Sequence, residues 1–428
     1  MYTPKFLFQT KEKVKKNYNR IFFRYVPRKI LLILYQTRDF YRTVIDYSSA
    51  KKILIFKKTA SKNSKINILF YHPSGLGFGG TEKSLQVIAK YLDKKKYNVY
   101  YMYSAAPVTH SNGSNRLNGR RDYLENTSIH LIEFESKKTK YNQTPDIFTV
   151  IHNQDIDLVI AAGGGIADFP INLVRNIPII MINVFGDIAI QKNIRKHICI
   201  SKEVQNKITP VIDIEKTEII PILSELPVKN FRELGEGIRN KFNIKKTDIV
   251  FGRIGRPDNA IFDPIGINAF KQLTISHPDI HYIVMAPPKI LIQKVKQENI
   301  PRVYFLNSSS KEEDIWAFHG SIDVLAHFRQ DGESFGLNIA ESMLAGNPII
   351  SHVSHMWNAH LEYLDDSFSR VAGIDDAKTY AEHMEFMIKR YKENKLKKMG
   401  ENARKKAEKL FYVKSRMQEI NKIISDVT

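Results

Sequence analysis

Two glutamates, Glu333 and Glu341, mark the stretch of the sequence that is best suited to chemistry. Glu333 stands in a predicted loop after an apolar run, and a predicted helix begins just behind it, near Phe335 or Gly336. Glu341 then lies about a turn and a half inside that helix. The two carboxylates therefore flank the start of a helix.

The start of this helix favours an anionic ligand. Free backbone amides around Ser334 to Leu337 can bind a phosphate through hydrogen bonds and the helix dipole. Gly336 has no side chain to obstruct a ligand that approaches the backbone closely. Because carboxylates repel a phosphate, we expect the two glutamates to face hydroxyl groups, one on a sugar and the other on a ribose.

The strands and helices around the two glutamates must position them. Along the chain, short apolar runs alternate with predicted helices. This alternation predicts one doubly wound α/β domain over 66–228 and a second over 229–405. We expect a C-terminal helix, 406–428, to pack back across the domain boundary. The expected strands are 66–71, 99–103, 129–132, 158–162, 177–182 and 197–200 in the first domain, and 249–253, 280–285, 303–306, 322–326 and 348–352 in the second.

The residues around the two glutamates resemble the motif of a large family, the retaining, family 4-like glycosyltransferases also called glycosyl transferases group 1. The motif stands here as Glu333-Ser334-Phe335-Gly336, followed by Glu341 and by Gly346-Asn347-Pro348. The resemblance covers about 66–410. It implies an α/β fold of two Rossmann-like doubly wound domains that face a cleft (GT-B), here with a basic helical N-terminal extension.

The resemblance also implies a donor site. Glu341 would hydrogen-bond the ribose of a nucleotide, and Glu333 would contact hydroxyls of the donor sugar. Arg253, in Gly252-Arg253-Ile254, would neutralise the diphosphate together with the amides after Ser334. Glu333 and Arg253 are therefore the catalytic candidates. No metal and no other cofactor is required if fixed cations and a helix N-terminus stabilise the leaving group.

The other matches to the family are weaker, and the sequence departs from the family pattern at two positions. Gly79 and Gly80 follow the first predicted strand and resemble the glycine loop that approaches the donor and acceptor. The lysine that usually follows the phosphate-binding arginine is missing, and Arg256 is the candidate to replace it. The histidine common in the first-domain crevice is also missing, and Asp187 is a possible polar replacement.

The basic charge of the chain is concentrated at its N-terminus. Residues 1–66 contain 17 Lys+Arg and 3 Asp+Glu, a net charge of +14 out of +20 for the whole chain, and basic and aromatic residues are interleaved there. Three interpretations fit residues 1–65: attachment to an anionic membrane surface, which we favour, a solvated helical appendage packed on the main body, or nucleic-acid binding. We expect no nucleic-acid partner, because no nucleic-acid motif accompanies the charge.

These observations predict a glycosyltransferase that moves a sugar from a nucleotide-diphosphate-sugar donor to a hydroxyl of a glycan or lipid-linked acceptor. The reaction would proceed with retention, in cell-surface polysaccharide or glycolipid synthesis. The enzyme would be cytoplasmic, at the face of the membrane, a setting that fits the single cysteine, Cys199. The alternative is a non-catalytic GT-B protein that binds a nucleotide sugar or a glycan as a scaffold, and the two departures motivate it.

Overall fold

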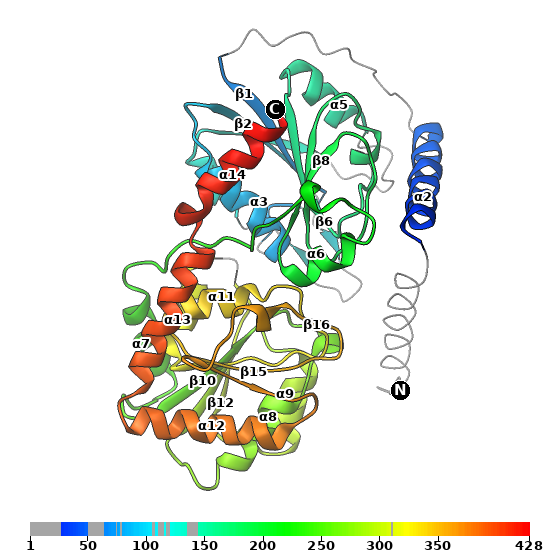
Figure 1. Ribbon diagram of the computed structural model, residues 1–428. Coiled ribbons are helices and arrows are strands. Elements are labelled where there is room, and N and C mark those ends of the chain that lie inside the picture. The colour runs from blue at the N-terminus through cyan, green and yellow to red at the C-terminus, as the bar shows by residue number, and fades with distance from the viewer. Residues whose placement is uncertain are drawn as a thin grey trace. The chain divides into compact units, whose positions relative to one another are not determined.

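The structure is a computed structural model that describes residues 27–49, 64–134 and 144–428, apart from short gaps at 74, 78, 105–107, 110–114, 117–119 and 310. The described residues divide into two compact units (Figure 1). The N-terminal unit comprises 27–223 with 413–428, and the C-terminal unit comprises 224–412. Most of the basic extension for which a membrane role is predicted, 1–26 and 50–63, lies outside the described residues.

The N-terminal unit is built on a seven-stranded parallel sheet with the strand order β5-β2-β1-β6-β7-β8-β9. Its central strands are buried along nearly their whole length, as parallel strands covered on both faces must be. The strands are β1 (Ile66–His72), β2 (Tyr97–Ser104), β5 (Ile129–Phe134), β6 (Leu158–Gly163), β7 (Ile179–Asn183), β8 (Ile194–Cys199) and β9 (Thr217–Ile219), with a separate hairpin of β3 (Val108–Thr109) and β4 (Asn115–Arg116). The helices are α2 (Arg28–Ser49), α3 (Gly80–Tyr91), α4 (Arg121–Glu125), α5 (Thr144–Asn153), α6 (Lys202–Ile208) and α14 (Val413–Val427), with short 3-10 turns at Ile171–Leu173 and Ile214–Lys216.

The C-terminal unit is built on a six-stranded parallel sheet with the strand order β12-β11-β10-β13-β15-β17. The strands are β10 (Ile249–Ile254), β11 (Ile280–Met285), β12 (Val303–Leu306), β13 (Val324–Ala326), β15 (Ile349–His352) and β17 (Ser369–Ala372), and β14 (Gly332–Glu333) pairs separately with β16 (Trp357–Asn358). The helices are α7 (Phe231–Lys241), α8 (Ile265–Leu273), α9 (Lys289–Gln297), α10 (Glu312–Ser321), α11 (Leu337–Leu344), α12 (Ala377–Lys392) and α13 (Leu396–Phe411), with 3-10 turns at Asn259–Ile261 and Ala359–Glu362.

The strand order reverses beside the first strand of each sheet, between β1 and β6 and between β10 and β13. At such a switch point the connections leave in opposite directions, so a crevice opens at the carboxyl ends of the two strands. The expected class, α/β with two Rossmann-like doubly wound domains, is confirmed. The short edge strands β9 and β17 were not anticipated, because neither has a long apolar run.

Helices α7 and α10 of the C-terminal unit touch backbone to backbone through two glycines. A Cβ atom at Gly235 would lie 2.2 Å from the carbonyl carbon of Gly320, and one at Gly320 would lie 2.1 Å from the carbonyl oxygen of Phe231. No side chain fits at such distances without moving a helix. The contact fixes the position of α10, which leads directly into β13.

The substitution Gly235→Ala should therefore destabilise the protein, although alanine favours a helix more than glycine does. We expect the free energy of unfolding to fall by about 1–3 kcal/mol, because the added methyl group forces α7 away from α10. Gly237→Ala is the matched control two residues further along α7, where a Cβ would meet nothing within 4 Å. It should raise the free energy of unfolding by about 0.5–1 kcal/mol. Urea denaturation compares the two variants, and equal stabilisation by both would show that the helices are not in close contact.

Candidate functional site

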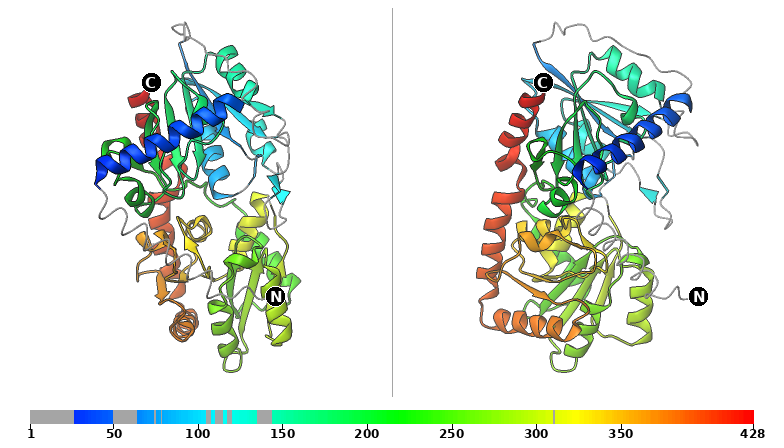
Figure 2. Two further views of the ribbon diagram at one scale, coloured as in Figure 1. Left: turned by 90° about the vertical axis from the view of Figure 1, so that its right-hand side faces the viewer. Right: turned by 45° about the vertical axis from the view of Figure 1, so that its right-hand side comes forward.

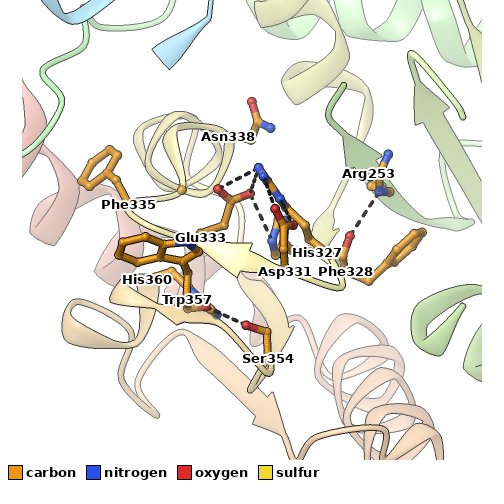
Figure 3. Close-up of polar contacts among 12 residues, drawn as sticks. Arg253, His327, Phe328, Asp331, Glu333, Phe335, Asn338, Ser354, Trp357 and His360 are labelled. Carbon is orange, nitrogen blue, oxygen red and sulfur yellow. Dashed lines mark hydrogen bonds and ion pairs between the residues drawn. The ribbon is translucent and has the colours of Figure 1, made fainter. Parts of the chain in front are cut away.

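The candidate site lies at the switch point of the C-terminal unit. Strand β10 ends in Arg253 and Ile254, and beside it the chain leaves β13 through the segment 327–336 before α11 begins. Figure 3 shows the side chains that gather there. The amide side chain of Asn338 donates to the carbonyl oxygen of Ile254 (3.0 Å) and so ties the start of α11 to the end of β10.

Arg253 is a buried cation that the described residues leave incompletely partnered. The residue is 2% exposed, and its Nε donates to the carbonyl oxygen of Phe328 at 3.3 Å. The guanidinium also lies 4.9 Å from the centre of the Phe328 ring. Among the residues that the structure describes, none accepts a hydrogen bond from its Nη1. Burial lowers the pKa of Arg253 to about 10, so the group stays charged at neutral pH.

A buried cation with an unused donor is costly to leave unpaired, so it favours an anionic ligand. Arg329, a second cation near Arg253, lowers the pKa of Arg253 further. The repulsion between the two cations would be relieved by a negatively charged ligand in the crevice.

Arg329 bridges two carboxylates in the segment after β13. Its Nε and Nη2 donate to the two oxygens of Asp331 (2.6 and 2.9 Å), and its Nη1 donates to Glu333 (3.2 Å). Burial alone would lower the pKa of Arg329, but the two carboxylates outweigh burial and raise it. Arg329 is therefore a permanent cation that orients the carboxylate of Glu333.

Glu333 itself is nearly enclosed, since its side chain is 12% exposed. Burial raises the pKa of Glu333 above its ordinary value, and Arg329 opposes this rise. Arg256, exposed in the loop after β10, also lies close enough to lower the pKa of Glu333. The site thus holds a carboxylate whose ionised form depends on neighbouring arginines.

Three buried histidines surround this carboxylate segment and contribute no charge at neutral pH. The Nε2 atom of His327 lies 3.6 Å from Glu333, too far for a hydrogen bond, and burial lowers the pKa of His327 well below its ordinary value. The backbone amide of Arg329 donates to Nε2 of His352 (3.1 Å), so the proton of that ring is on Nδ1. Burial lowers the pKa of His360 to about 4.

The N-terminus of α11 begins at an unusual backbone turn. Gly336, at the N-cap, has φ +92°, and a Cβ there would lie 2.8 Å from the hydroxyl oxygen of Tyr363. That hydroxyl donates to the carbonyl oxygen of Phe335 at 2.5 Å. The carbonyl oxygen of Gly336 is the first acceptor of the helix, and the amides of Ile339 and Ala340 donate to it. The amides of Leu337 and Asn338 have no helical carbonyl four residues before them, so they are available to a ligand.

A small two-stranded sheet holds Glu333 in place. Glu333 pairs with Asn358, and Gly332 pairs with Trp357. Gly332 has φ +69°, and a Cβ there would lie 1.8 Å from the carbonyl oxygen of Trp357, so only glycine fits. The hydroxyl of Ser354 donates to the same carbonyl oxygen (2.7 Å) and closes the loop.

The structure brings most of the predicted site residues together in the C-terminal unit. Glu341 is 2% exposed and lies about one turn inside α11, which ends before Gly346 with its φ of +79°. The predicted residues at this switch point are Arg253, Arg256, Glu333, Ser334, Phe335, Gly336, Leu337 and Glu341. Gly79 and Gly80 belong to the N-terminal unit, where they form the N-cap and first residue of α3 after β1.

The sequence predictions missed three residues of the site: His327, Arg329 and Asn338. The spacing Arg329-x-Asp331-x-Glu333 was a usable signal, because a basic residue two and four positions before acidic ones can bridge both. His327 and Asn338 carried no comparable signal, because their roles depend on contacts with distant segments.

The arrangement is suited to an anion that carries hydroxyl groups. A buried guanidinium and the first amides of α11 can bind the anion, and an oriented carboxylate can accept hydrogen bonds from hydroxyls. Among the residues that the structure describes, no group of three or more His, Cys, Asp and Glu side chains is arranged to hold a metal ion.

Several solved structures share the fold of this chain. A glycosyltransferase from Rickettsia africae has a TM-score of 0.66 at 15% identity, covering 85% of this chain and 99% of its own. HepE of Anabaena, in complex with UDP and glucose, has a TM-score of 0.65 at 19% identity, covering 84% and 100%. WaaG, a glycosyltransferase involved in lipopolysaccharide biosynthesis, has a TM-score of 0.56 at 14% identity, covering 83% and 99%. At these identities the likeness shows the fold alone.

No curated protein sequence matches the chain. Residues 236–406, which contain the whole switch-point site, match the family described as glycosyl transferases group 1. The resemblance seen in the motif around Glu333 and Glu341 is thereby confirmed. The C-terminal unit thus contains a match to the glycosyl transferases group 1 model, and the chain shares its fold with the GT-B glycosyltransferases.

Proposed function

We propose that this protein is a glycosyltransferase that moves a sugar from a nucleotide-diphosphate-sugar donor to a hydroxyl of an acceptor. The observation that carries the proposal is the buried guanidinium of Arg253, whose Nη1 has no partner among the described residues, on the strand that Asn338 ties to the start of α11. The diphosphate of the donor is the anion that this pair of features would accept. The group 1 match over 236–406 supports the same class of reaction.

The proposed mechanism relies on fixed charges. As the bond between the sugar carbon and the phosphate oxygen breaks, negative charge grows on the diphosphate, and Arg253 and the amides of α11 stabilise it without having to reorganise. Arg256 adds a second cation in place of the missing lysine. Glu333 accepts hydrogen bonds from the donor sugar, and the buried carboxylate of Glu341 does the same for the ribose. We propose that transfer retains the anomeric configuration and requires no metal.

A uridine diphosphate sugar is the first donor to test, because HepE of Anabaena, which shares the fold, is solved in complex with UDP and glucose. We propose that the acceptor is a glycan or a lipid-linked hydroxyl in cell-surface polysaccharide or glycolipid synthesis. The basic charge of residues 1–65 supports a place at the cytoplasmic face of a membrane.

Donor hydrolysis and transfer by the purified protein test the proposal. A panel of nucleotide sugars, with and without EDTA, should reveal one donor that is turned over equally in both conditions. Donor binding without any turnover would favour the alternative function, a non-catalytic scaffold that binds nucleotide sugars.

The substitution Arg253→Met separates a role in donor binding from a structural role. We expect kcat/KM for the donor to fall by about 10²–10³-fold, as for the loss of one group that stabilises developing charge. Because the substitution also removes an incompletely partnered buried charge, the unfolding free energy without donor should stay unchanged or rise, by up to about 4 kcal/mol. Steady-state kinetics and urea denaturation measure the two effects.

Arg302→Met is the matched control for this substitution. Arg302 directly precedes β12, so it lies at the amino ends of the strands, away from the site at their carboxyl ends. Its guanidinium donates to three backbone carbonyl oxygens. Its loss should destabilise the protein and leave the kinetic constants for the donor unchanged. If Arg253→Met instead lowered stability and left turnover intact, the proposed donor site would be wrong.

The substitution Arg329→Met should shift the pH dependence of turnover. Burial already raises the pKa of Glu333, and the variant removes the neighbour that most opposes this rise. Because Glu333 acts as a carboxylate, activity is lost as pH falls through its pKa, so the acid limb of the kcat/KM profile should move to higher pH. Arg329→Lys keeps the positive charge, so its acid limb should lie between those of the wild type and Arg329→Met. An unmoved acid limb in Arg329→Met would show that Arg329 does not act through Glu333.

A further inference from the structure

Helix α2 is attached to the N-terminal unit by its charged side. Arg42 forms an ion pair with Asp168, and Arg38 donates to the carbonyl oxygen of Ile188. Asp39 accepts a hydrogen bond from the amide of Ile190 (2.9 Å). Figure 2 shows α2, in dark blue, lying along the outside of this unit.

The same face continues along the whole length of the helix. Asp46, near the C-terminal end of α2, is 2% exposed and accepts from the side chain of Asn172 (2.6 Å). Arg28, at the first turn, pairs with Asp213. The contacts at 168–172, 188–190 and 213 therefore hold α2 at several points, and they determine which side faces outward.

The outward side of α2 is apolar. Phe40 is 71% exposed, Tyr41 66% and Ile33 59%. Ile30, Leu34 and Val44 are also exposed, and the spacing of these six residues places them on one face of a helix. We call these six residues the outer stripe.

Apart from Leu31, which is buried on the inner side, this orientation is the reverse of the usual one for a helix on a protein surface. Such a helix normally turns its apolar side to the core and its charges to water. A row of exposed large apolar side chains, here interrupted only by Thr37, marks a contact with another apolar phase or partner. Turning α2 so that the outer stripe faces the unit would move Asp46 away and leave the buried side-chain amide of Asn172 facing apolar side chains.

We infer that the outer stripe of α2 is a membrane-binding surface that inserts into the headgroup layer of an anionic bilayer. The basic charge on both sides of α2 in the sequence favours an anionic membrane as the partner. Residues 1–27 and 50–65 contain 13 Lys+Arg and one Asp or Glu. Basic residues beside an exposed apolar helix face are the combination that binds anionic lipid. In the described part of the chain, no helix is long and apolar enough to span a bilayer.

The position of α2 also bears on the acceptor. Ile188 and Ile190 belong to the segment that leaves the carboxyl end of β7, and Asp187 in this segment adds to the rise that burial causes in the pKa of Tyr35 of α2. The helix therefore binds a segment that begins at the edge of the sheet where a Rossmann-like unit takes its ligand. A membrane bound by α2 would lie beside that edge, which suits an acceptor carried on a lipid. This last step rests on the proposed function.

Vesicle co-sedimentation of the full chain tests the inference. The wild type should bind vesicles of phosphatidylcholine and phosphatidylglycerol (7:3) and bind pure phosphatidylcholine much more weakly. The double variant Ile33→Glu, Phe40→Glu should bind the anionic vesicles at least tenfold more weakly. The matched control is Ile275→Glu, Ile374→Glu, which changes two exposed isoleucines of the C-terminal unit and should bind like the wild type.

Fluorescence of a single added tryptophan tests the orientation of the helix. The two native tryptophans, Trp316 and Trp357, are buried in the C-terminal unit and give a constant background. In Phe40→Trp the added indole should shift to the blue on anionic vesicles and be quenched by brominated lipid, at a depth of about 5–10 Å. Ile275→Trp should show neither effect.

Three results would overturn the inference. The first is no vesicle binding by the wild type at low salt, and the second is equal binding by the Ile33→Glu, Phe40→Glu variant. The third is that the wild type binds no vesicles but self-associates, and that this variant abolishes the self-association. The last result would make the outer stripe an interface between two copies of the chain. Donor hydrolysis in solution separates this inference from the proposed function, because the variant should hydrolyse donor as the wild type does. Vesicle binding without donor hydrolysis by either protein would leave the membrane surface standing and refute the transferase.

Discussion

The reversal of strand order between β10 and β13 is the constraint on which the C-terminal unit depends. It places the ends of two strands that are about 70 residues apart in sequence side by side, so the Nε of Arg253 reaches the carbonyl oxygen of Phe328 and Asn338 reaches that of Ile254. The same closeness buries a guanidinium with an unsatisfied Nη1. A buried guanidinium with a donor still available is suited to an anionic ligand.

The carboxylate of Glu333, unlike the guanidinium of Arg253, is held by partners within the protein. Glu333 is nearly enclosed, yet Arg329 supports its charge and the pairing of β14 with β16 fixes its backbone. Gly332 and Gly336 both have positive φ, which allows the chain to enter and leave this short strand within a few residues. One cation without a full set of partners and one carboxylate that is fully oriented thus lie in the same small region, where they suit the two halves of a sugar phosphate.

Much of this could be predicted from the sequence. The buried apolar runs identified the main strands because parallel strands covered on both faces leave few positions for polar residues. The spacing of Glu333, Glu341 and Gly346 located α11 and its end, since these signals are local. Arg329 and His327 were missed, because a bridging or buried role depends on which segments meet. The short edge strands β9 and β17 were missed because their pairing comes from the neighbouring strand and not from an apolar run of their own.

Helix α2 shows most clearly what the sequence determines and what the tertiary structure decides. Its amino acids alone determined that one face is charged and the opposite face apolar, because the 3.6-residue period of a helix follows from the order of the residues. Only the tertiary structure decided which face is turned inward, because that depends on Asp168, Asn172 and the backbone at 188–190, which lie more than 120 residues away in the sequence. The sequence by itself therefore determined the elements, the motif and the excess of basic charge. The tertiary structure decided which charges are compensated and which surfaces remain open, since both depend on the contacts that distant segments make when they pack.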